Sequence, residues 1–446
     1  MITFYTEKYT PRLKYVVQHV FEKILCTNVN ITKDIEEAKK ADGPIICYSR
    51  TEILMGAFNI LPHGLLFQSD IRELNITVSD WDGMPIFFQS NSDRYDIPFD
   101  IFSAIFYLIS RYEEYNGETD EHGRFRKENS IAYKNDFIAR PLVDEWAYKL
   151  EALLTEKVGY TPAKKQRFRM HSSVVIDNLF KYRHRSILKN TAQIFSKLFS
   201  GNWRGLKHQL RVLLYLDNDP YNNLDFIIRF HNDVKLNPSF FVLMHKGGND
   251  SKCLYSTYKS LRKTLRRSYV TGLHPSYASN SNTKKIRKEL KALEKKITKQ
   301  RVTTAMFHRL RFNLPISYES LLKIGISDDY SMGYIDSVGF RASTCTPFRF
   351  YDMKHECKTR LMIHPLLFTD ESIKESGIHH GSFEDTMIPM INSIKKVNGQ
   401  FCCCISNRVL SNTDKWYGWR TAIERVYRYA SELELHDIQK SQELLL

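Results

Sequence analysis

The chain has 446 residues and a formal net charge of +15, and 42% of its residues are hydrophobic. Its length predicts two or three domains, and its apolar content excludes a wholly disordered protein. It has no run of about 18 apolar residues, and it does not begin with a basic segment followed by an apolar one. The sequence therefore predicts a cytoplasmic protein with neither a spanning helix nor a cleaved secretory signal. Its basic charge indicates an anionic partner.

Residues 1–160 are predicted to form a first α/β unit, because short apolar strands alternate there with amphipathic helices. The expected strands cover residues 2–6, 43–49, 62–68 and 84–90, and the expected helices cover residues 11–25, 99–115 and 141–157. The polar and basic stretch 157–169 contains Gly159 and Pro162. These two residues favour a break in regular structure, so the stretch is the predicted linker.

From about residue 170 the sequence repeats strand and helix. The expected strands cover residues 172–177, 239–245, 269–276, 302–307, 327–336, 338–343, 360–366 and 401–406, and the expected helices cover 194–216, 224–235, 283–299, 317–325 and 382–396. This alternation predicts a mainly parallel sheet with both faces covered and enough strands for a barrel-like closure. In such folds the polar residues that end the strands face the active site.

The positive charge is concentrated in two segments. Residues 161–216 carry a net charge of +11 and residues 257–311 carry +14, so the rest of the chain is acidic. Within the first segment, residues 194–216 form a basic amphipathic pattern that contains Trp203, and such a pattern suits binding to an anionic bilayer. The alternative is a pair of helices that pack on their own domain and keep their basic side in solvent. Residues 283–300 predict a surface helix. Nucleic acid is not expected, because neither segment interleaves aromatic and base-reading residues.

Eight cysteines are present, and none forms a C-x-x-C pair or a zinc-finger spacing with histidine. Cys402, Cys403 and Cys404 lie in a predicted buried strand, where neighbouring side chains point to opposite faces and cannot chelate together. We expect reduced, buried thiols.

Several residues of metal-ligand or acid–base type stand at the predicted strand ends: Asp177, His274, His308, Asp328, Asp329, Arg341 and His364. One Asp and two His from separate strands could form a three-ligand metal site with an open position for water. Each residue also has a structural alternative. Asp177 could cap a helix, Arg341 could bind a local carboxylate, and a strand-end His could be a core hydrogen-bonding group.

A resemblance to a known family rests on long strings of the sequence. They are FDIFSAIFYLISRYEEY, RPLVDEW, LHPSYASN, FHRLRFNLPISYESLLKIGISDDYSMGY, GFRASTCTPFRFYD and DKWYGWR. The chain resembles the polysaccharide-deacetylase-like proteins of Bacteroidetes, which have a NodB-homology domain related to carbohydrate esterase family four. The resemblance implies a deformed (β/α) barrel of NodB type over residues 161–446, with a basic helical insertion near 186–220, preceded by a smaller α/β domain over residues 1–160.

The resemblance also implies the removal of N-acetyl groups from amino sugars at a divalent metal, expected to be zinc. Asp177, His274 and His308 match the metal ligands. The residues expected to assist catalysis are Asp329, Arg341 and His364, and those expected to contact sugar are Tyr330, Tyr334 and Tyr277.

The sequence departs from the family pattern at three functional positions. Val175 stands where the family has its general base, and Ala278 stands where it has a second metal-binding His. Ser406 stands where the family has a His, late in the sequence, that acts as general acid. Two hypotheses follow. The first is a divergent metal-dependent deacetylase acting on a glycan or glycan precursor. The second is a catalytically inactive glycan-binding protein associated with a membrane or a lipid-linked sugar.

Overall fold

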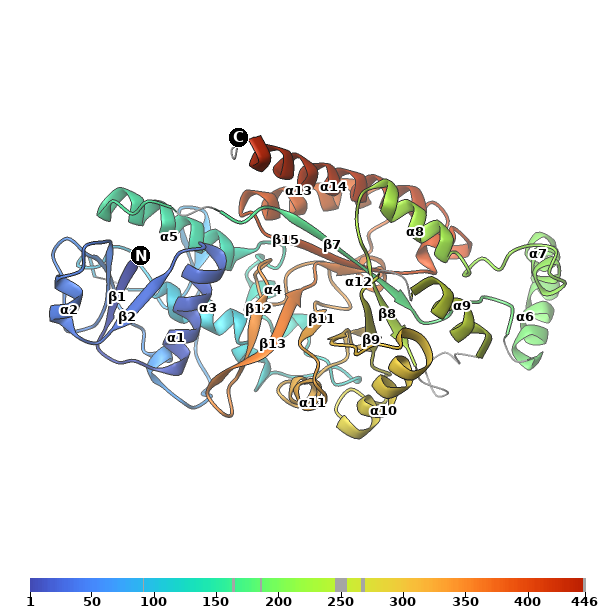
Figure 1. Cartoon of the computed structure of the whole chain (residues 1–446), viewed down its shortest axis with the longest axis horizontal. Helices are drawn as coiled ribbons and strands as arrows, with labels where there is room; N and C mark the ends of the chain where they lie inside the picture. The colour runs from blue at the N-terminus through green and yellow to red at the C-terminus, as the bar shows by residue number, and fades with distance from the viewer. Residues whose placement is uncertain (91, 163–164, 185–186, 245–254, 266–268, 444–446) are drawn as a thin grey trace.

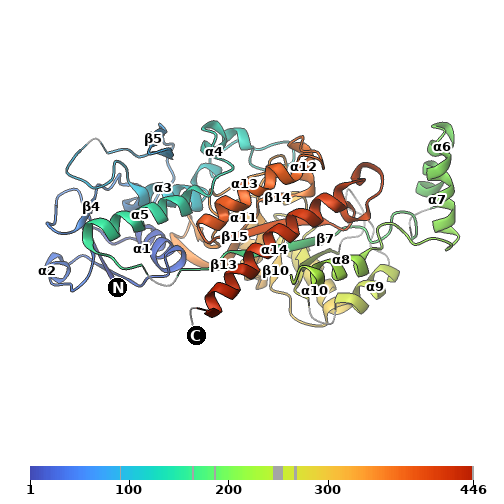
Figure 2. The same cartoon turned by 90° about the horizontal axis from the view of Figure 1, so that it is seen from above.

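The computed structural model describes residues 1–90, 92–162, 165–184, 187–244, 255–265 and 269–443 (Figure 1). The fold is mixed α/β, as predicted. A large curled sheet forms a half-barrel, and a smaller α/β part built from the N-terminal residues lies beside it (Figures 1 and 2). The boundary near residue 160 remains a prediction.

The smaller part contains a parallel four-stranded sheet in the order β2-β1-β3-β4. Its strands are β1 (Ile2–Thr6), β2 (Val29–Thr32), β3 (Ile45–Tyr48) and β4 (Phe58–Ile60), and a separate hairpin joins β5 (Ser79–Trp81) and β6 (Met84–Ile86). The helices are α1 (Pro11–Gln18), α2 (Ile35–Lys39), α3 (Ile101–Ile109), α4 (Ile131–Lys134) and α5 (Leu142–Val158). Thr10 and Asp100 accept backbone N–H groups at the starts of α1 and α3, which fixes where these helices begin.

Two predicted elements of this part are wrong. Residues 62–68 do not form a strand; Leu65–Phe67 make a short 3₁₀ turn after Gly64, whose φ is 111°. The helix expected over residues 99–115 ends at Ile109, because Arg111 adopts a left-handed conformation with φ of 56°. That turn buries the Arg111 guanidinium against the carboxylates of Glu113 and Glu114.

The large sheet has nine strands in the order β12-β13-β11-β10-β9-β8-β7-β15-β14. They are β7 (Arg169–Ile176), β8 (Ser239–Leu243), β9 (Thr271–His274), β10 (Thr304–Ala305), β11 (Asp328–Met332), β12 (Phe348–Asp352), β13 (Cys357–Pro365), β14 (Phe368–Thr369) and β15 (Gln400–Ser406). Every pairing is parallel except that of β12 with β13. Residues 338–343 were expected to be a strand but form turns, and β12 and β14 were not predicted.

The segment between β13 and β14 connects the two sides of the curled sheet. The amide of Leu366 donates to the carbonyl of Met332 on β11, and the next amide, of Leu367, donates to the carbonyl of Cys402 on β15. The concave face is filled by a small buried cluster: Val175, Phe241, Met306, Leu310, Tyr330, Leu366, Cys402 and Cys404. These side chains make the concave interior a packed core.

The remaining helices cover the outside of the sheet or extend from it. They are α6 (Ile187–Phe199), α7 (Trp203–Leu213), α8 (Leu224–Asp233), α9 (Tyr255–Leu265), α10 (Thr283–Leu293), α11 (Ile316–Ile324), α12 (Asp370–Glu375), α13 (Phe383–Lys396) and α14 (Trp419–Glu443). Helices α13 and α14 pack together over β15 and β7 (Figure 2). Within the described residues, no helix has both the length and the apolar content needed to span a bilayer.

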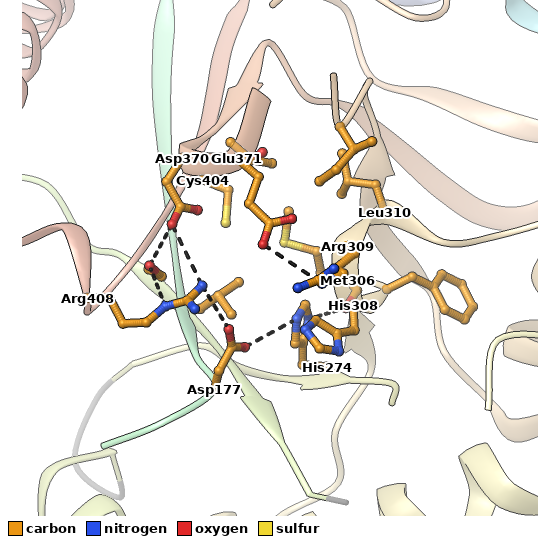
Figure 3. A pocket seen from close by; sticks show the side chains of 15 residues that line it. Asp177, His274, Met306, His308, Arg309, Leu310, Asp370, Glu371, Cys404 and Arg408 are labelled. Atoms are coloured by element: carbon orange, nitrogen blue, oxygen red, sulfur yellow. Dashed lines mark hydrogen bonds and ion pairs between the residues drawn. The ribbon is translucent and has the colours of Figure 1, made fainter. Parts of the chain in front are cut away.

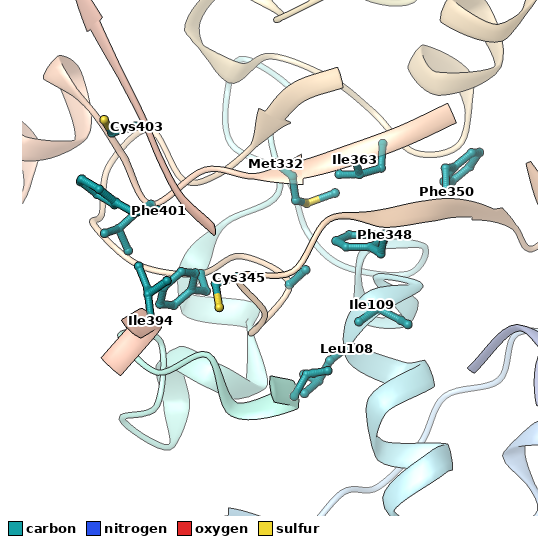
Figure 4. Close-up of a cluster of buried hydrophobic side chains, with 14 of the residues drawn as sticks. Leu108, Ile109, Met332, Cys345, Phe348, Phe350, Ile363, Ile394, Phe401 and Cys403 are labelled. Carbon is teal, nitrogen blue, oxygen red and sulfur yellow. The ribbon is translucent and has the colours of Figure 1, made fainter. Parts of the chain in front are cut away.

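The two parts share one hydrophobic core. Leu108 and Ile109 of α3 belong to the same buried cluster as Phe348 of β12 and Phe401 of β15 (Figure 4). The buried carboxylate of Asp144 on α5 accepts hydrogen bonds from both side chains and backbone of residues 344–346. The smaller part is therefore fixed against the large sheet. Seven cysteines are unpaired, and Cys253 lies outside the described residues.

Candidate metal centre

Three predicted metal ligands meet at the carboxyl ends of β7, β9 and β10. Asp177 directly follows β7, His274 is the last residue of β9, and His308 begins a 3₁₀ turn (His308–Leu310) after β10. One ligand atom from each of them lies within 4.8 Å of the others. No helix starts at Asp177, since the next helix begins at Ile187, so the capping alternative does not apply.

Local backbone structure positions the two histidines. The amide of Met306 donates to the carbonyl of Leu273, and the amide of His308 donates to the carbonyl of Pro275, so the ends of β9 and β10 stay side by side. After His308 the chain turns sharply, because Arg309 and Leu310 have φ angles of 54° and 50°. Consecutive non-glycine residues with left-handed backbone are costly and often mark functional sites.

The geometry fits a metal held by two nitrogens and an oxygen. Nδ1 of His274 lies 2.5 Å from the carbonyl oxygen of Met306, to which it donates, and its Nε2 lies 3.7 Å from Oδ1 of Asp177. The imidazole rings of His274 and His308 are 5.0 Å apart. Oδ1 of Asp177 is buried and accepts no hydrogen bond. Donors about 2.0–2.1 Å from a tetrahedral zinc lie roughly 3.4 Å apart, so a small inward movement suffices.

Charge at the site favours an ionised Asp177. Burial opposes its ionisation, but the Arg408 guanidinium, followed by His308 and His274, holds the pKa of this carboxyl below its usual range. Nη2 of Arg408 lies 3.2 Å from Oδ2 of Asp177 and 3.9 Å from Oδ2 of Asp370. One guanidinium therefore links the candidate ligand to a second carboxylate.

That second carboxylate, Asp370, stands across the cleft at the start of α12 (Figure 3). The hydroxyl of Ser406 donates to its Oδ2 at 2.7 Å. Burial raises the pKa of Asp370 to about 6, with Arg408 acting in the opposite direction and Glu371 reinforcing the rise. A buried carboxyl with a pKa near neutrality, beside a possible metal site, can exchange a proton with a bound reactant.

A small cleft opens in front of these groups. Its lining combines the three candidate ligands with the opposite acidic edge and a few apolar side chains: Val175, Asp177, His274, Met306, Phe307, His308, Arg309, Leu310, Ile335, Thr369, Asp370, Glu371, Cys404, Ser406 and Arg408. Arg309 reaches across toward Glu371, with Nε 3.9 Å from Oε1 (Figure 3). Val175 and Ser406 thus line the cleft, at the two positions where the sequence departs from the pattern that it resembles.

Asp329, His364 and Tyr330 do not line this cleft. Asp329 is buried on β11 and accepts hydrogen bonds from the Tyr318 hydroxyl and from both the amide and hydroxyl of Ser331. His364 pairs with Asp328 at 3.1 Å and stacks on Tyr330 with ring centres 4.2 Å apart. The ring of Tyr330 in turn belongs to the packed interior.

Arg341 and Tyr334 line a neighbouring hollow. Leu310 and Ile335 belong to the walls of both this hollow and the cleft, and residues 120–128 of the smaller part complete it. Arg341 is buried and binds Glu114 through two contacts of 2.6 and 2.8 Å. Arg341 therefore binds a carboxylate of the protein itself, Glu114, which is the structural alternative given for it in the sequence analysis.

Tyr277 lies outside the cleft and contacts the segment 120–128, which lines the neighbouring hollow. Its hydroxyl is 2.7 Å from Nδ1 of His122, and Arg311 donates to the carbonyl oxygens of both Tyr277 and His122. Tyr277 therefore ties the region after β9 to the smaller part.

Sequence reasoning missed Asp370, Glu371 and Arg408. The pattern LLFTDES does carry a signal, because an apolar run ends in Thr369, a helix N-cap, followed by two acids. Arg408 lies two positions beyond the end of the predicted strand 401–406.

Comparisons with known proteins add little to this geometry. Residues 2–159 match a family of unknown function, DUF7033. No curated protein matches the chain. A solved structure described as a "putative polysaccharide deacetylase from Mycobacterium smegmatis" is similar, with a TM-score of 0.40 and 10% identity, covering 63% of this chain and 94% of that one. It is a distant structural neighbour, and a likeness at this level carries no functional argument.

Proposed function

We propose that this protein is a metal-dependent hydrolase that removes N-acetyl groups from a glycan or glycan precursor, with a deformed barrel of NodB type as its scaffold. The observation that carries the proposal is the meeting of Asp177, His274 and His308 at one cleft that also holds Asp370. The two nitrogens and one oxygen suit zinc, and the proposed site would leave a position for water.

A metal held by these residues would acidify a water molecule and polarise the acetyl carbonyl. The chain's own groups then have distinct tasks. Asp370 would accept the proton of the attacking water, in place of the carboxylate that Val175 cannot supply. Arg408 would hold Asp370 and Asp177 at a fixed separation. His274 keeps its Nδ1 proton on the carbonyl of Met306, which aims Nε2 at the site.

The carbohydrate would extend from the cleft into the neighbouring hollow. Tyr334 and Arg341 line that hollow together with charged residues of the smaller part. The three candidate ligands lie within the two basic segments, residues 161–216 and 257–311, so an anionic or lipid-linked glycan is the class of carbohydrate that we propose. A cytoplasmic site of action remains our prediction. We assign no catalytic step to Asp329 or His364, because neither side chain lines the cleft.

The test is acetate release from N-acetylated oligosaccharides by the zinc-loaded full chain. Wild type should release acetate, and Asp370→Asn should lower the rate by about 10²–10⁴-fold while it keeps the metal. Asp385→Asn, on an exposed position of α13, is the matched control and should retain full activity. No acetate release from any N-acetylated sugar by a metal-loaded wild type would refute the hydrolase.

The glycan-binding alternative is favoured by one observation, the apolar Val175 at the position of the family's base. The same preparation separates the two functions. Saturable binding of the oligosaccharide without acetate release would support the binding protein.

A further inference from the structure

The helical hairpin formed by α6 and α7 stands apart from the rest of the molecule (Figures 1 and 2). None of the residues of α6 is buried, and in α7 only Gln209 and Val212 are. Helices in a folded protein normally gain their stability by burying an apolar face. This hairpin instead leaves much of its apolar surface uncovered.

Each helix exposes an apolar stripe with the same spacing. On α6 the stripe contains Leu188, Phe195 and Phe199, which are 82%, 57% and 85% exposed. On α7 it contains Trp203, Leu210 and Leu214, of which Trp203 is 64% and Leu214 is 68% exposed. Both sets follow i, i+7 and i+11, so each lies along one face of its helix. Contiguous exposed apolar surface of this kind marks an interaction site.

The charge of the hairpin has a single sign. Residues 187–216 contain five Lys or Arg and no Asp or Glu. Arg204 and Lys207 are exposed on α7, close in sequence to Trp203. An exposed apolar stripe with Trp, flanked by Lys and Arg, is the composition of a helix that lies in the interface of an anionic bilayer.

Two chain segments, which include residues 178–183 and 219–221, connect the hairpin to the edge of the candidate metal cleft. The carboxylate of Asp219 accepts hydrogen bonds from the backbone amides of Lys181, Tyr182 and Arg183. These bonds join the two chain segments that lead to and from the hairpin. Nδ2 of Asn407 donates to the carbonyls of Asn178 and Tyr221 in the same segments. Asn407 lies in sequence between Ser406 and Arg408, both of which line the cleft. The chain segments that lead to the hairpin are thus tied to the edge of that site.

We propose that the α6–α7 hairpin docks the protein on an anionic lipid bilayer, with its apolar stripes in the interface and its basic residues on the headgroups. A second copy of the chain fits the surface less well, because the same face of two copies would bring like charges together. Docking does not depend on the proposed hydrolase. It would place the cleft close to a membrane surface.

The experiment measures binding of the full chain to vesicles of phosphatidylglycerol and phosphatidylcholine, compared with vesicles of phosphatidylcholine alone. Binding should need the anionic lipid and fall steeply as salt rises. R204E/K207E should bind at least about 30-fold more weakly, because the loss of each basic residue near an anionic surface costs roughly a factor of five and the new negative charges add repulsion. F195S/F199S should lose about tenfold or more. Brominated lipid should quench wild-type fluorescence, and W203F should lose that quenching.

Two controls isolate the hairpin. K284E/K288E makes the same charge change on the exposed side of α10, and M55S removes an apolar side chain that is exposed elsewhere; both should bind like wild type. Absence of vesicle binding at low salt would overturn the proposal. So would an equal loss in K284E/K288E, or light scattering that shows a dimer dissociated by F195S/F199S without any vesicle binding. Because all substituted side chains are exposed, circular dichroism should show unchanged folding.

Discussion

The ion pair between the two parts of the molecule gives the sharpest test of the structure. Glu114 is buried and binds Arg341 through both guanidinium contacts, and its Oε1 also lies 2.6 Å from Nε of Arg111. Arg111 has a second partner in Glu113. Apart from Glu114, the hydrogen-bond partner of the Arg341 guanidinium among the described residues is the carbonyl of Gly333, at 3.3 Å. Replacing Glu114 by Gln therefore leaves the charge of Arg341 buried and uncompensated.

The expected magnitudes follow from that arrangement. Breaking a buried pair by neutralising one partner costs about 3–5 kcal/mol, so Glu114→Gln should lose this much free energy of unfolding. Arg341→Met should lose less, because Glu114 keeps Arg111. The double variant should be more stable than Glu114→Gln alone, because no unpaired guanidinium remains at Arg341.

The pH dependence provides an independent check. Burial opposes ionisation of Glu114, but Arg341 and then Arg111 hold its pKa below its usual range. A depressed folded pKa means that the stabilisation is present above the unfolded value and is lost as pH falls through the folded value. Wild type should therefore lose more stability in acid than Glu114→Gln does.

Urea unfolding followed by circular dichroism, at neutral and acid pH, measures all of these differences. A Glu114→Gln variant within about 1 kcal/mol of wild type at neutral pH would refute the reasoning. A double variant that loses the sum of the two single losses would refute it equally, since it would show that the two side chains do not interact.

Three further predictions concern buried positions. Burial raises the pKa of Asp329 from 3.8 to about 6, so the free energy of unfolding should fall by about 3 kcal/mol as the pH rises across this interval. When the free energy of urea unfolding is plotted against pH, Asp329→Asn should flatten the curve in this interval. Parallel curves for wild type and variant would contradict this. In Gly272→Ala the new Cβ would meet the Phe241 ring at 2.5 Å, so the variant should be less stable by about 1–3 kcal/mol, and an unchanged melting temperature would contradict the packing. Asp144→Ala leaves two buried hydroxyls and one amide without their acceptor and should cost about 3 kcal/mol or more in thermal unfolding; a loss below about 1 kcal/mol would contradict it.

The candidate ligands could be predicted from the sequence because each stands where an apolar run ends. Parallel strands bring such positions to one edge, which is why Asp177, His274 and His308 meet. Asp370 also follows an apolar run, but that run, Leu366–Phe368, has only three residues, so its signal is weaker than that of the three ligands. Its burial, which raises its pKa, is a property of the folded cleft.

Long-range partners were also beyond the sequence. Arg341 and Glu114 are 227 residues apart, and nothing local indicates that the two parts pack through this pair. His364 ends a predicted strand as His274 does, yet its strand places it beside Tyr330 and Asp328, away from the cleft lining. For α6 and α7 the amphipathic pattern predicted helices, but the same pattern fits a packed or an exposed pair.

The measurement that tests the central claim most directly is the metal content of the purified full chain after growth with added zinc. The structure predicts about one zinc per chain in wild type and in Asp385→Asn, and loss of the metal in His274→Ala and Asp177→Ala, each folded by circular dichroism. A wild type that holds no zinc, or zinc retained equally in all four proteins, would contradict a metal centre at Asp177, His274 and His308.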